Sequence, residues 1–135
     1  MRSLLRGALL MLFVAGCGNW HQMRPLTANN IQVGGLTLYV ANAEYAVRGD
    51  RVKVTLVVDN PSQEMQQFDP QWVALRGASG LTFQPAHIQP PLPASMPPGY
   101  RLSTTYMFNH VPQQETTQMA LLVAGTETMK FSGTY

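Results

Sequence analysis

Alternation of apolar and polar residues is the feature that most restricts how this chain can fold. In the segment 51–58 every second residue is apolar, namely Val52, Val54, Leu56 and Val58. Successive side chains of a strand point to opposite faces of a sheet, so a period of two buries one face and leaves the other in water. The segment therefore predicts a half-buried β-strand, which ends at the turn residues Asn60 and Pro61.

The same alternation recurs along the chain, and no segment has the periodicity of a long amphipathic helix. It is clearest in Tyr100–Phe108, in Met119–Val123 and after Gly125, where Met129 and Phe131 fall on one side. Shorter candidates, separated by Gly, Asn or Pro, are Leu36–Val40, Glu44–Arg48, Trp72–Leu75 and Leu81–Phe83. About seven or eight short strands with turn residues between them predict an all-β fold, an antiparallel β-sandwich over residues 31–135.

The first 16 residues have the pattern of an export signal. A positively charged start, Met1–Arg6, precedes an apolar stretch, Ala8–Val14, and two small residues, Ala15 and Gly16. The apolar stretch is shorter than the roughly 20 residues that a membrane-spanning helix needs. We therefore expect residues 1–16 to be a cleaved signal peptide that takes no part in the fold.

Cys17 is the single cysteine of the chain and directly follows these small residues. The stretch Val14–Cys17 resembles the lipobox of bacterial lipoproteins, whose first residue is usually Leu. The resemblance implies cleavage before Cys17 and a covalent lipid such as palmitate on its thiol. An ordinary signal peptide with a stray cysteine, or a buried core cysteine, is the alternative. One unpaired thiol would be a reactive group in an exported domain, which favours the lipoprotein interpretation.

Residue 18 bears on the location of such a lipoprotein. It is Gly18 rather than the Asp that often retains lipoproteins in the inner membrane, so in a Gram-negative host the resemblance implies an outer-membrane protein that faces the periplasm. From Gly18 to about Asn30 the chain is polar and lacks periodicity. We therefore predict that residues 17–30 form a lipidated tether to the membrane.

A series of turns and core positions extends over residues 35–131. It consists of Arg48–Asp50, the strand end Val57–Pro61, Phe68–Pro70 with Trp72, Gly80 before Leu81–Phe83, Pro98-Gly99 before the strand that ends at Phe108, and Val111-Pro112. Their order is similar to that in the immunoglobulin-like domains of bacterial lipoproteins known as the DUF4352 type. The resemblance implies an immunoglobulin-like sandwich in an exported accessory module, and it implies no catalytic residues. The proline-rich segment Pro85–Pro98 is longer than the family pattern.

Charge and motif spacing argue against two classes of function. Of the nine Lys and Arg, two (Arg2 and Arg6) lie in the predicted signal, and the remaining seven balance seven Asp and Glu. Nucleic-acid binding needs clustered cations, so we expect no nucleic-acid partner. The three histidines have neither triad nor zinc-site spacing, and Gly77–Gly80 reads as a β-turn, since it lacks the strand-turn-helix setting of a nucleophile elbow. We therefore expect no enzyme activity.

The leading hypothesis for function is a non-catalytic interaction module for another envelope protein. The segment 84–99 holds six prolines and should be extended and stiff. Its apolar residues would form a contact surface that consists of Ile88, Leu92 and Met96. The same segment could instead be a connection packed over the sandwich edge, where it would block edge-to-edge aggregation. The sequence leaves both interpretations open.

The alternative hypothesis is a periplasmic Cu(I) carrier. Thioether and imidazole groups suit Cu(I), and the candidate ligands are His21, Met23, Met107 and His110. Methionines that fill gaps in a core would account for part of the same pattern. Apart from a lipid on Cys17, we expect no cofactor under the leading hypothesis.

Overall fold

The structure is a computed structural model that describes residues 19–27, 30–91 and 94–133. Its elements are β1 Trp20–Gln22, β2 Arg24–Pro25, β3 Ile31–Val33, β4 Leu36–Ala46, β5 Arg51–Asp59, β6 Gln66–Gln67, the 3-10 helix η1 Pro70–Trp72, β7 Val73–Arg76, β8 Thr82–Phe83, β9 His87–Gln89, β10 Ser95–Met96, β11 Arg101–Phe108, the 3-10 helix η2 Gln113–Thr117, β12 Met119–Val123 and β13 Thr126–Ser132. The predicted signal peptide and Cys17 lie outside the described residues. Neither helix among the described residues is long and apolar enough to cross a membrane.

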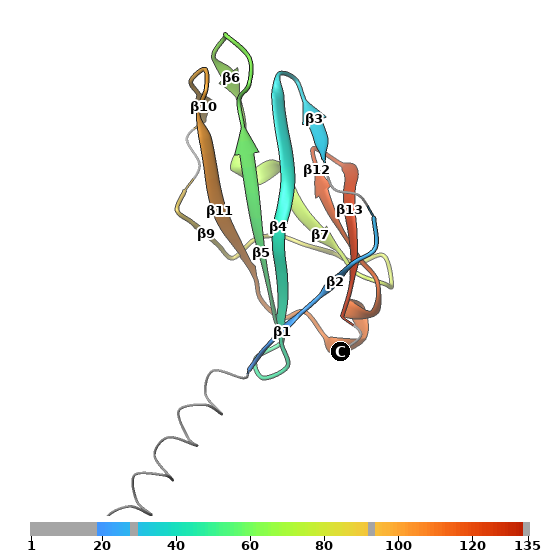
Figure 1. Cartoon of the computed structure of the whole chain (residues 1–135). Helices are drawn as coiled ribbons and strands as arrows, with labels where there is room; N and C mark the ends of the chain where they lie inside the picture. The colour runs from blue at the N-terminus through green and yellow to red at the C-terminus, as the bar shows by residue number, and fades with distance from the viewer. Residues whose placement is uncertain (1–18, 28–29, 92–93, 134–135) are drawn as a thin grey trace, which may run out of the picture.

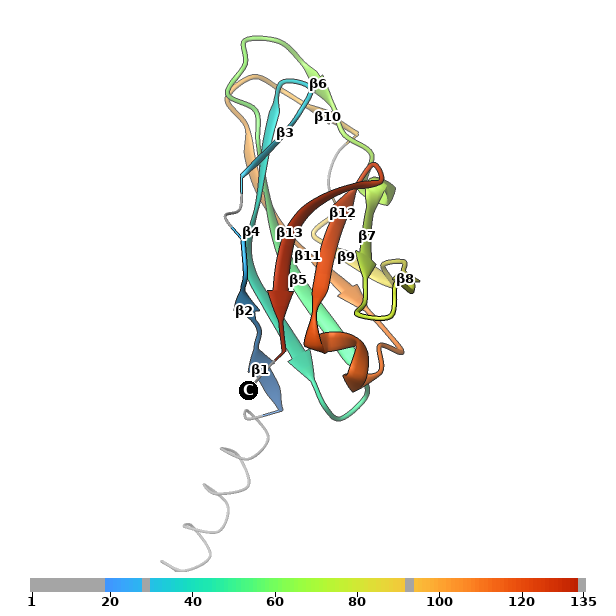
Figure 2. The ribbon, with the colours of Figure 1, turned by 90° about the vertical axis from the view of Figure 1, so that its right-hand side faces the viewer.

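Two antiparallel sheets pack face to face, which confirms the predicted all-β sandwich (Figures 1 and 2). The first sheet has the strand order β1-β4-β5-β11-β9, with β3 also paired to β4, and the second has the order β2-β13-β12-β7-β8. A small β6-β10 pair stands apart from both sheets. The described residues form more strands than the seven or eight expected, because several of the strands are only two or three residues long.

The long strand β4 combines two strands that the sequence predicts as separate, Leu36–Val40 and Glu44–Arg48. A β-bulge shifts the register to β5 between Val40 and Asn42. The extra residue changes the phase of the alternation, so that Leu38 and Val40 point to the core before the bulge and Ala43 and Tyr45 point there after it. One continuous strand therefore keeps a buried face along its whole length.

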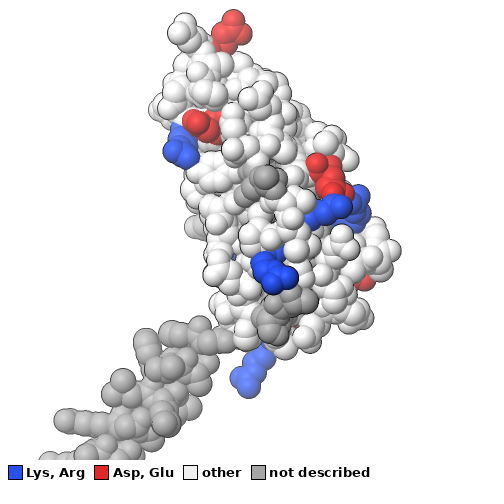
Figure 3. All heavy atoms as spheres, turned by 45° about the vertical axis from the view of Figure 1, so that its right-hand side comes forward, with Lys and Arg blue, Asp and Glu red and all other residues white. Residues whose placement is uncertain are grey.

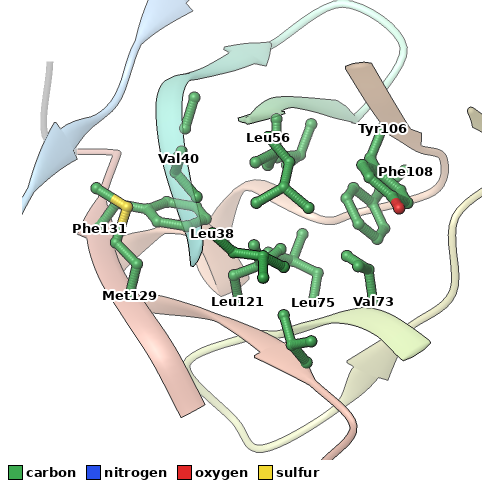
Figure 4. Packing of buried hydrophobic residues seen from close by; sticks show 14 of the residues in the cluster. Leu38, Val40, Leu56, Val73, Leu75, Tyr106, Phe108, Leu121, Met129 and Phe131 are labelled. Atoms are coloured by element: carbon green, nitrogen blue, oxygen red, sulfur yellow. The ribbon is translucent and has the colours of Figure 1, made fainter. Parts of the chain in front are cut away.

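The core lies between the two sheets and is built from the alternating residues that the sequence pattern identifies. Figure 4 shows side chains of the two sheets pointing toward one another, among them Leu38 and Leu56 from the first sheet and Leu75 and Leu121 from the second. Met119 and Met129 are buried in this core as well, as the gap-filling interpretation predicts. Since each sheet hides its apolar face against the other, neither sheet is stable alone.

A buried phenol takes part in this core. The Tyr106 hydroxyl donates a hydrogen bond to the backbone carbonyl of Pro70 at 3.3 Å. Burial raises the pKa of the Tyr106 phenol above its ordinary value, and the nearby Asp69 carboxylate adds to the rise. The phenol therefore stays neutral and remains a donor at neutral pH.

The described part of the predicted tether is built into the sandwich, which corrects that prediction for residues 19–27. β1 pairs with β4, the backbone N–H of Met23 donates to the carbonyl of Ala43 at 2.8 Å, and β2 pairs with β13. The chain thus crosses from the first sheet to the second over one open edge, which protects that edge. Strands this short carry no legible alternation, so the sequence pattern could not reveal them.

The proline-rich segment forms the corresponding crossing at the opposite edge. The chain leaves β8 on the edge of the second sheet and joins the first sheet as β9, which pairs with β11. Pro85 suits this crossing, because it lacks the N–H that a central strand must donate. Pro90, Pro91, Pro97 and Pro98 follow β9.

We predict that Leu38→Ala lowers the free energy of unfolding by about 2–5 kcal/mol, because it leaves a cavity in the core. Leu81→Ala is the matched control, since Leu81 is 59% exposed, and it should change stability by no more than about 0.5 kcal/mol. Urea unfolding followed by circular dichroism measures both values. Equal losses for the two variants would contradict the placement of the core.

Candidate binding site at the distal tip

The sandwich is elongated, and its two ends differ. β1 begins at one end, beside the turn between β4 and β5, and β6 and β10 lie at the other end (Figure 1). We call residues 60–67 and 95–100 the distal tip. The crossings at the two sheet edges leave the ends as the places where turns project from the fold.

The distal tip is organised around the side chain of Asn60, which is fully buried. Its Nδ2 donates to the backbone carbonyls of Glu64 at 2.9 Å and Met96 at 2.8 Å. Its Oδ1 accepts from the backbone N–H of Ser62 at 3.1 Å and from the Ser62 hydroxyl at 2.6 Å. The amide therefore uses both of its donors and its acceptor, and a buried amide satisfied in this way stabilises the turns that it joins.

The backbone of Asn60 also holds the turn that precedes β11. The N–H of Asn60 donates to the carbonyl of Tyr100 at 2.8 Å, and the N–H of Gly99 donates to the carbonyl of Asn60 at 2.9 Å. Gly99 has a φ of +76°, a conformation that glycine adopts without strain. The Pro98-Gly99 pair is therefore needed for this turn to close against Asn60.

Gln66 joins a third segment to the distal tip. Its side-chain Oε1 accepts from the backbone N–H of Gly35 at 3.1 Å, and its Nε2 donates to the Ser62 hydroxyl at 3.2 Å. A Cβ atom on Gly35 would lie 2.5 Å from Nε2 of Gln66, so only glycine fits there without displacing that side chain. The turn between β3 and β4 is thereby locked to the tip.

The distal tip exposes two large side chains of low polarity. Met65 is 55% exposed and Tyr100 is 53% exposed, and the adjacent Pro98 is exposed as well. Methionine and tyrosine are enriched in protein–protein interfaces. The hydrogen bonds of Asn60 already order the loops that hold Met65 and Tyr100, so these loops would lose little conformational entropy when a partner binds. Among the features of the described residues, this tip is the best candidate for a binding site.

The contact surface predicted on the proline-rich segment needs correction. Met96 is fully buried in the core and cannot contact a partner. Ile88 is half-buried, lies opposite Tyr106 in the first sheet and packs against the core, and Leu92 lies outside the described residues. The start of the segment, residues 84–89, connects the two sheets and pairs with β11 as β9, as in the alternative interpretation, and residues 95–99 belong to the distal tip. Sequence reasoning assigned Tyr100 to a strand and missed Met65.

The candidate copper ligands are not brought together. His21 is on β1 and the buried Met23 follows it, whereas Met107 is on β11 and the exposed His110 lies beyond that strand. β4 and β5 separate β1 from Met107 on β11, and three strand spacings amount to about 14 Å. The part of the chain that the structure describes also holds no group of three or more His, Cys, Asp or Glu arranged for a metal.

The segment Gly77–Gly80 forms the turn between β7 and β8, as predicted. The backbone N–H of Gly80 donates to the carbonyl of Gly77 at 3.0 Å, and the N–H of Ser79 donates to the buried Glu115 carboxylate at 3.1 Å. A hollow of about 200 Å³ beside this turn is lined by residues of the turn, by residues 118–120 and by Arg76 and Lys130. Glu127 forms ion pairs with both cations, so their combined charge is partly compensated.

Comparison with known proteins supports the fold alone. No protein-family model and no curated protein sequence matches this chain. The structure is similar to a conserved hypothetical protein from Bacillus anthracis, with a TM-score of 0.62, 8% identity, and coverage of 82% of this chain and 96% of that one. It is also similar to a functionally unknown protein from Listeria monocytogenes EGD-e, with a TM-score of 0.58, 11% identity, and coverage of 77% and 74%.

The distal tip holds one buried methionine, Met96, and one exposed methionine, Met65. We predict that Met96→Ala lowers the free energy of unfolding by about 2–5 kcal/mol, because it empties a buried site. Met65→Ala is the same chemical change at an exposed position and should alter stability by no more than about 0.5 kcal/mol. Chemical denaturation of both variants tests the assignment. A stable Met96→Ala protein would mean that this side chain is not part of the core.

Cu(I) titration with a competing chelator tests the separated ligands. We expect the purified protein to bind Cu(I) no better than roughly millimolar, since no compact set of soft ligands is present among the candidates. Met107→Ile and His110→Ala should leave the titration unchanged. A submicromolar site that either substitution abolishes would support the carrier hypothesis instead.

Proposed function

We propose that the protein is an exported lipoprotein, anchored through Cys17 in the outer membrane and facing the periplasm, which binds another envelope protein without catalysis. In this proposal the distal tip is the binding surface. The observation that supports this proposal best is the position of the tip. The exposed Met65 and Tyr100 lie on loops that Asn60 orders, at the end of the sandwich opposite β1.

The position of β1 supports the anchored arrangement. The first described residue, Asn19, is two residues after Cys17 and precedes β1 at the end away from the tip. A lipid on Cys17 would therefore hold this end at the membrane and leave the tip pointing into the periplasm. The resemblance to immunoglobulin-like domains of exported lipoproteins agrees with this arrangement.

The anchor is tested by Cys17→Ser in the full chain. We expect the unchanged protein to fractionate with membranes and detergent and to carry an acylated Cys17 as its first residue. The variant should accumulate as an uncleaved precursor or as a soluble form, because it lacks the thiol that receives the lipid. Mass spectrometry of the mature N-terminus checks this, and a mature protein that begins elsewhere and carries no lipid would contradict the anchor.

The tip is tested by site-specific photocrosslinking in intact cells. A photoreactive residue at Met65 or Tyr100 should give a discrete larger product, because both side chains face a partner in the proposal. The matched control is the same residue at Leu81, which is as exposed but lies on the β7–β8 turn. Products at Leu81 and none at the tip would contradict the proposed binding surface.

A further inference from the structure

The end of the sandwich opposite the tip carries an aromatic ring beside two cations. Lys53 Nζ lies 4.3 Å and Arg51 Cζ lies 5.3 Å from the centroid of the Trp20 ring. Arg51 also reaches the turn between β4 and β5, since its Nε would lie 3.2 Å from a Cβ atom on Gly49. Trp20, Val47, Arg48, Arg51 and Lys53 therefore surround one end of the first sheet, and we call them the basal patch.

The charge of the basal patch is only partly compensated. Lys53 pairs with Glu44 at 3.1 Å, and the Asp50 carboxylate lies 3.2 Å from the Tyr45 hydroxyl. No ion pair joins Arg48 or Arg51 to a carboxylate of the described residues. Figure 3 shows a blue side chain projecting at the lower end of the molecule. The basal patch therefore has cations available for an external anion.

The composition of the basal patch suits a membrane surface. Trp prefers the level of the lipid headgroups, where its ring meets apolar groups and its N–H meets polar ones. Arginines beside it would meet lipid phosphates, to which a guanidinium can donate two parallel hydrogen bonds. Val47, the first residue of the turn between β4 and β5, is 40% exposed and adds an apolar group to the same end.

We infer that the basal patch rests on the phospholipid bilayer, with Trp20 among the headgroups and Arg48 and Arg51 on lipid phosphates. The inference rests on the proposed lipid anchor. Cys17 is two residues before Asn19, and two residues of extended chain span at most about 7 Å. A lipid at Cys17 therefore brings the basal patch to the membrane, and its contacts hold the sandwich upright with the distal tip away from the bilayer.

The two tryptophans of the chain allow a matched test. Trp72 in η1 lies beside the turn between β12 and β13, away from the basal patch (Figure 2). Protein expressed from the full chain is purified from membranes and reconstituted in vesicles of phosphatidylethanolamine and phosphatidylglycerol with brominated acyl chains. Trp72→Phe then reports on Trp20 alone, and Trp20→Phe reports on Trp72 alone.

We expect the brominated lipids to reduce Trp20 emission roughly two-fold or more, because the ring lies at the headgroup level, and to leave Trp72 emission unchanged. Equal quenching of the two, or none, in protein that still floats with the vesicles would overturn the inference while the anchor stands. Protein that does not float would contradict the anchor itself, and with it the inference.

Charge reversal distinguishes the contribution of the arginines to membrane contact from that of the lipid on Cys17. Arg48→Glu should reduce the quenching of Trp20 without releasing the protein from the vesicles, because the lipid still holds it. Arg101→Glu makes the same change of charge at the far end of the first sheet and should have no effect. Equal effects of both substitutions, or no effect of Arg48→Glu, would contradict a role of the basal patch in contacting phosphates.

Discussion

The fold depends on one constraint. Each of the two sheets has one apolar face, and these faces are removed from water only when the sheets pack on each other. Leu38, Val40 and Leu56 on the first sheet have their counterparts in Leu75 and Leu121 on the second. A sandwich made in this way has two open edges, and the chain covers both by crossing between the sheets, from β1 to β2 at one edge and from β8 to β9 at the other. The turns between the long strands therefore project at the two ends of the sandwich.

The distal tip shows how a buried polar group can prepare a surface for binding. Asn60 joins the loop that follows β5 to the chain before β11, because one amide bonds carbonyls of Glu64 and Met96. The Asn60 side chain is fully buried, whereas Met65 and Tyr100 are exposed. The loops are therefore ordered by contacts within the chain, as the proposed binding surface requires.

The sequence predicts the long strands β5 and β11 well, divides β4 into two strands at its β-bulge, and predicts the contact residues poorly. The alternation in 51–58 and 100–108 corresponds to β5 and β11 to within one residue, because a period of two is a direct consequence of strand geometry. The alternation does not predict the strands β1 and β2, because two or three residues are too few to show a period. Composition identifies the prolines of 84–99 but not which side chains face inward, so Met96 was placed at the surface. The role of Asn60 depends on Met96, 36 residues away, and a sequence shows only that Asn60 is a turn residue.

The side-chain hydrogen bonds of Asn60 join the loops of the distal tip, whereas the two large sheets are held by the pairing of their own strands. Hydrogen exchange of Asn60→Ala, compared residue by residue with the unchanged protein, distinguishes these two parts of the fold. We expect protection to be lost in residues 61–67 and 95–100 while the paired strands β4, β5 and β11 keep theirs. Unchanged protection at the tip, or an equal loss across both sheets, would contradict it.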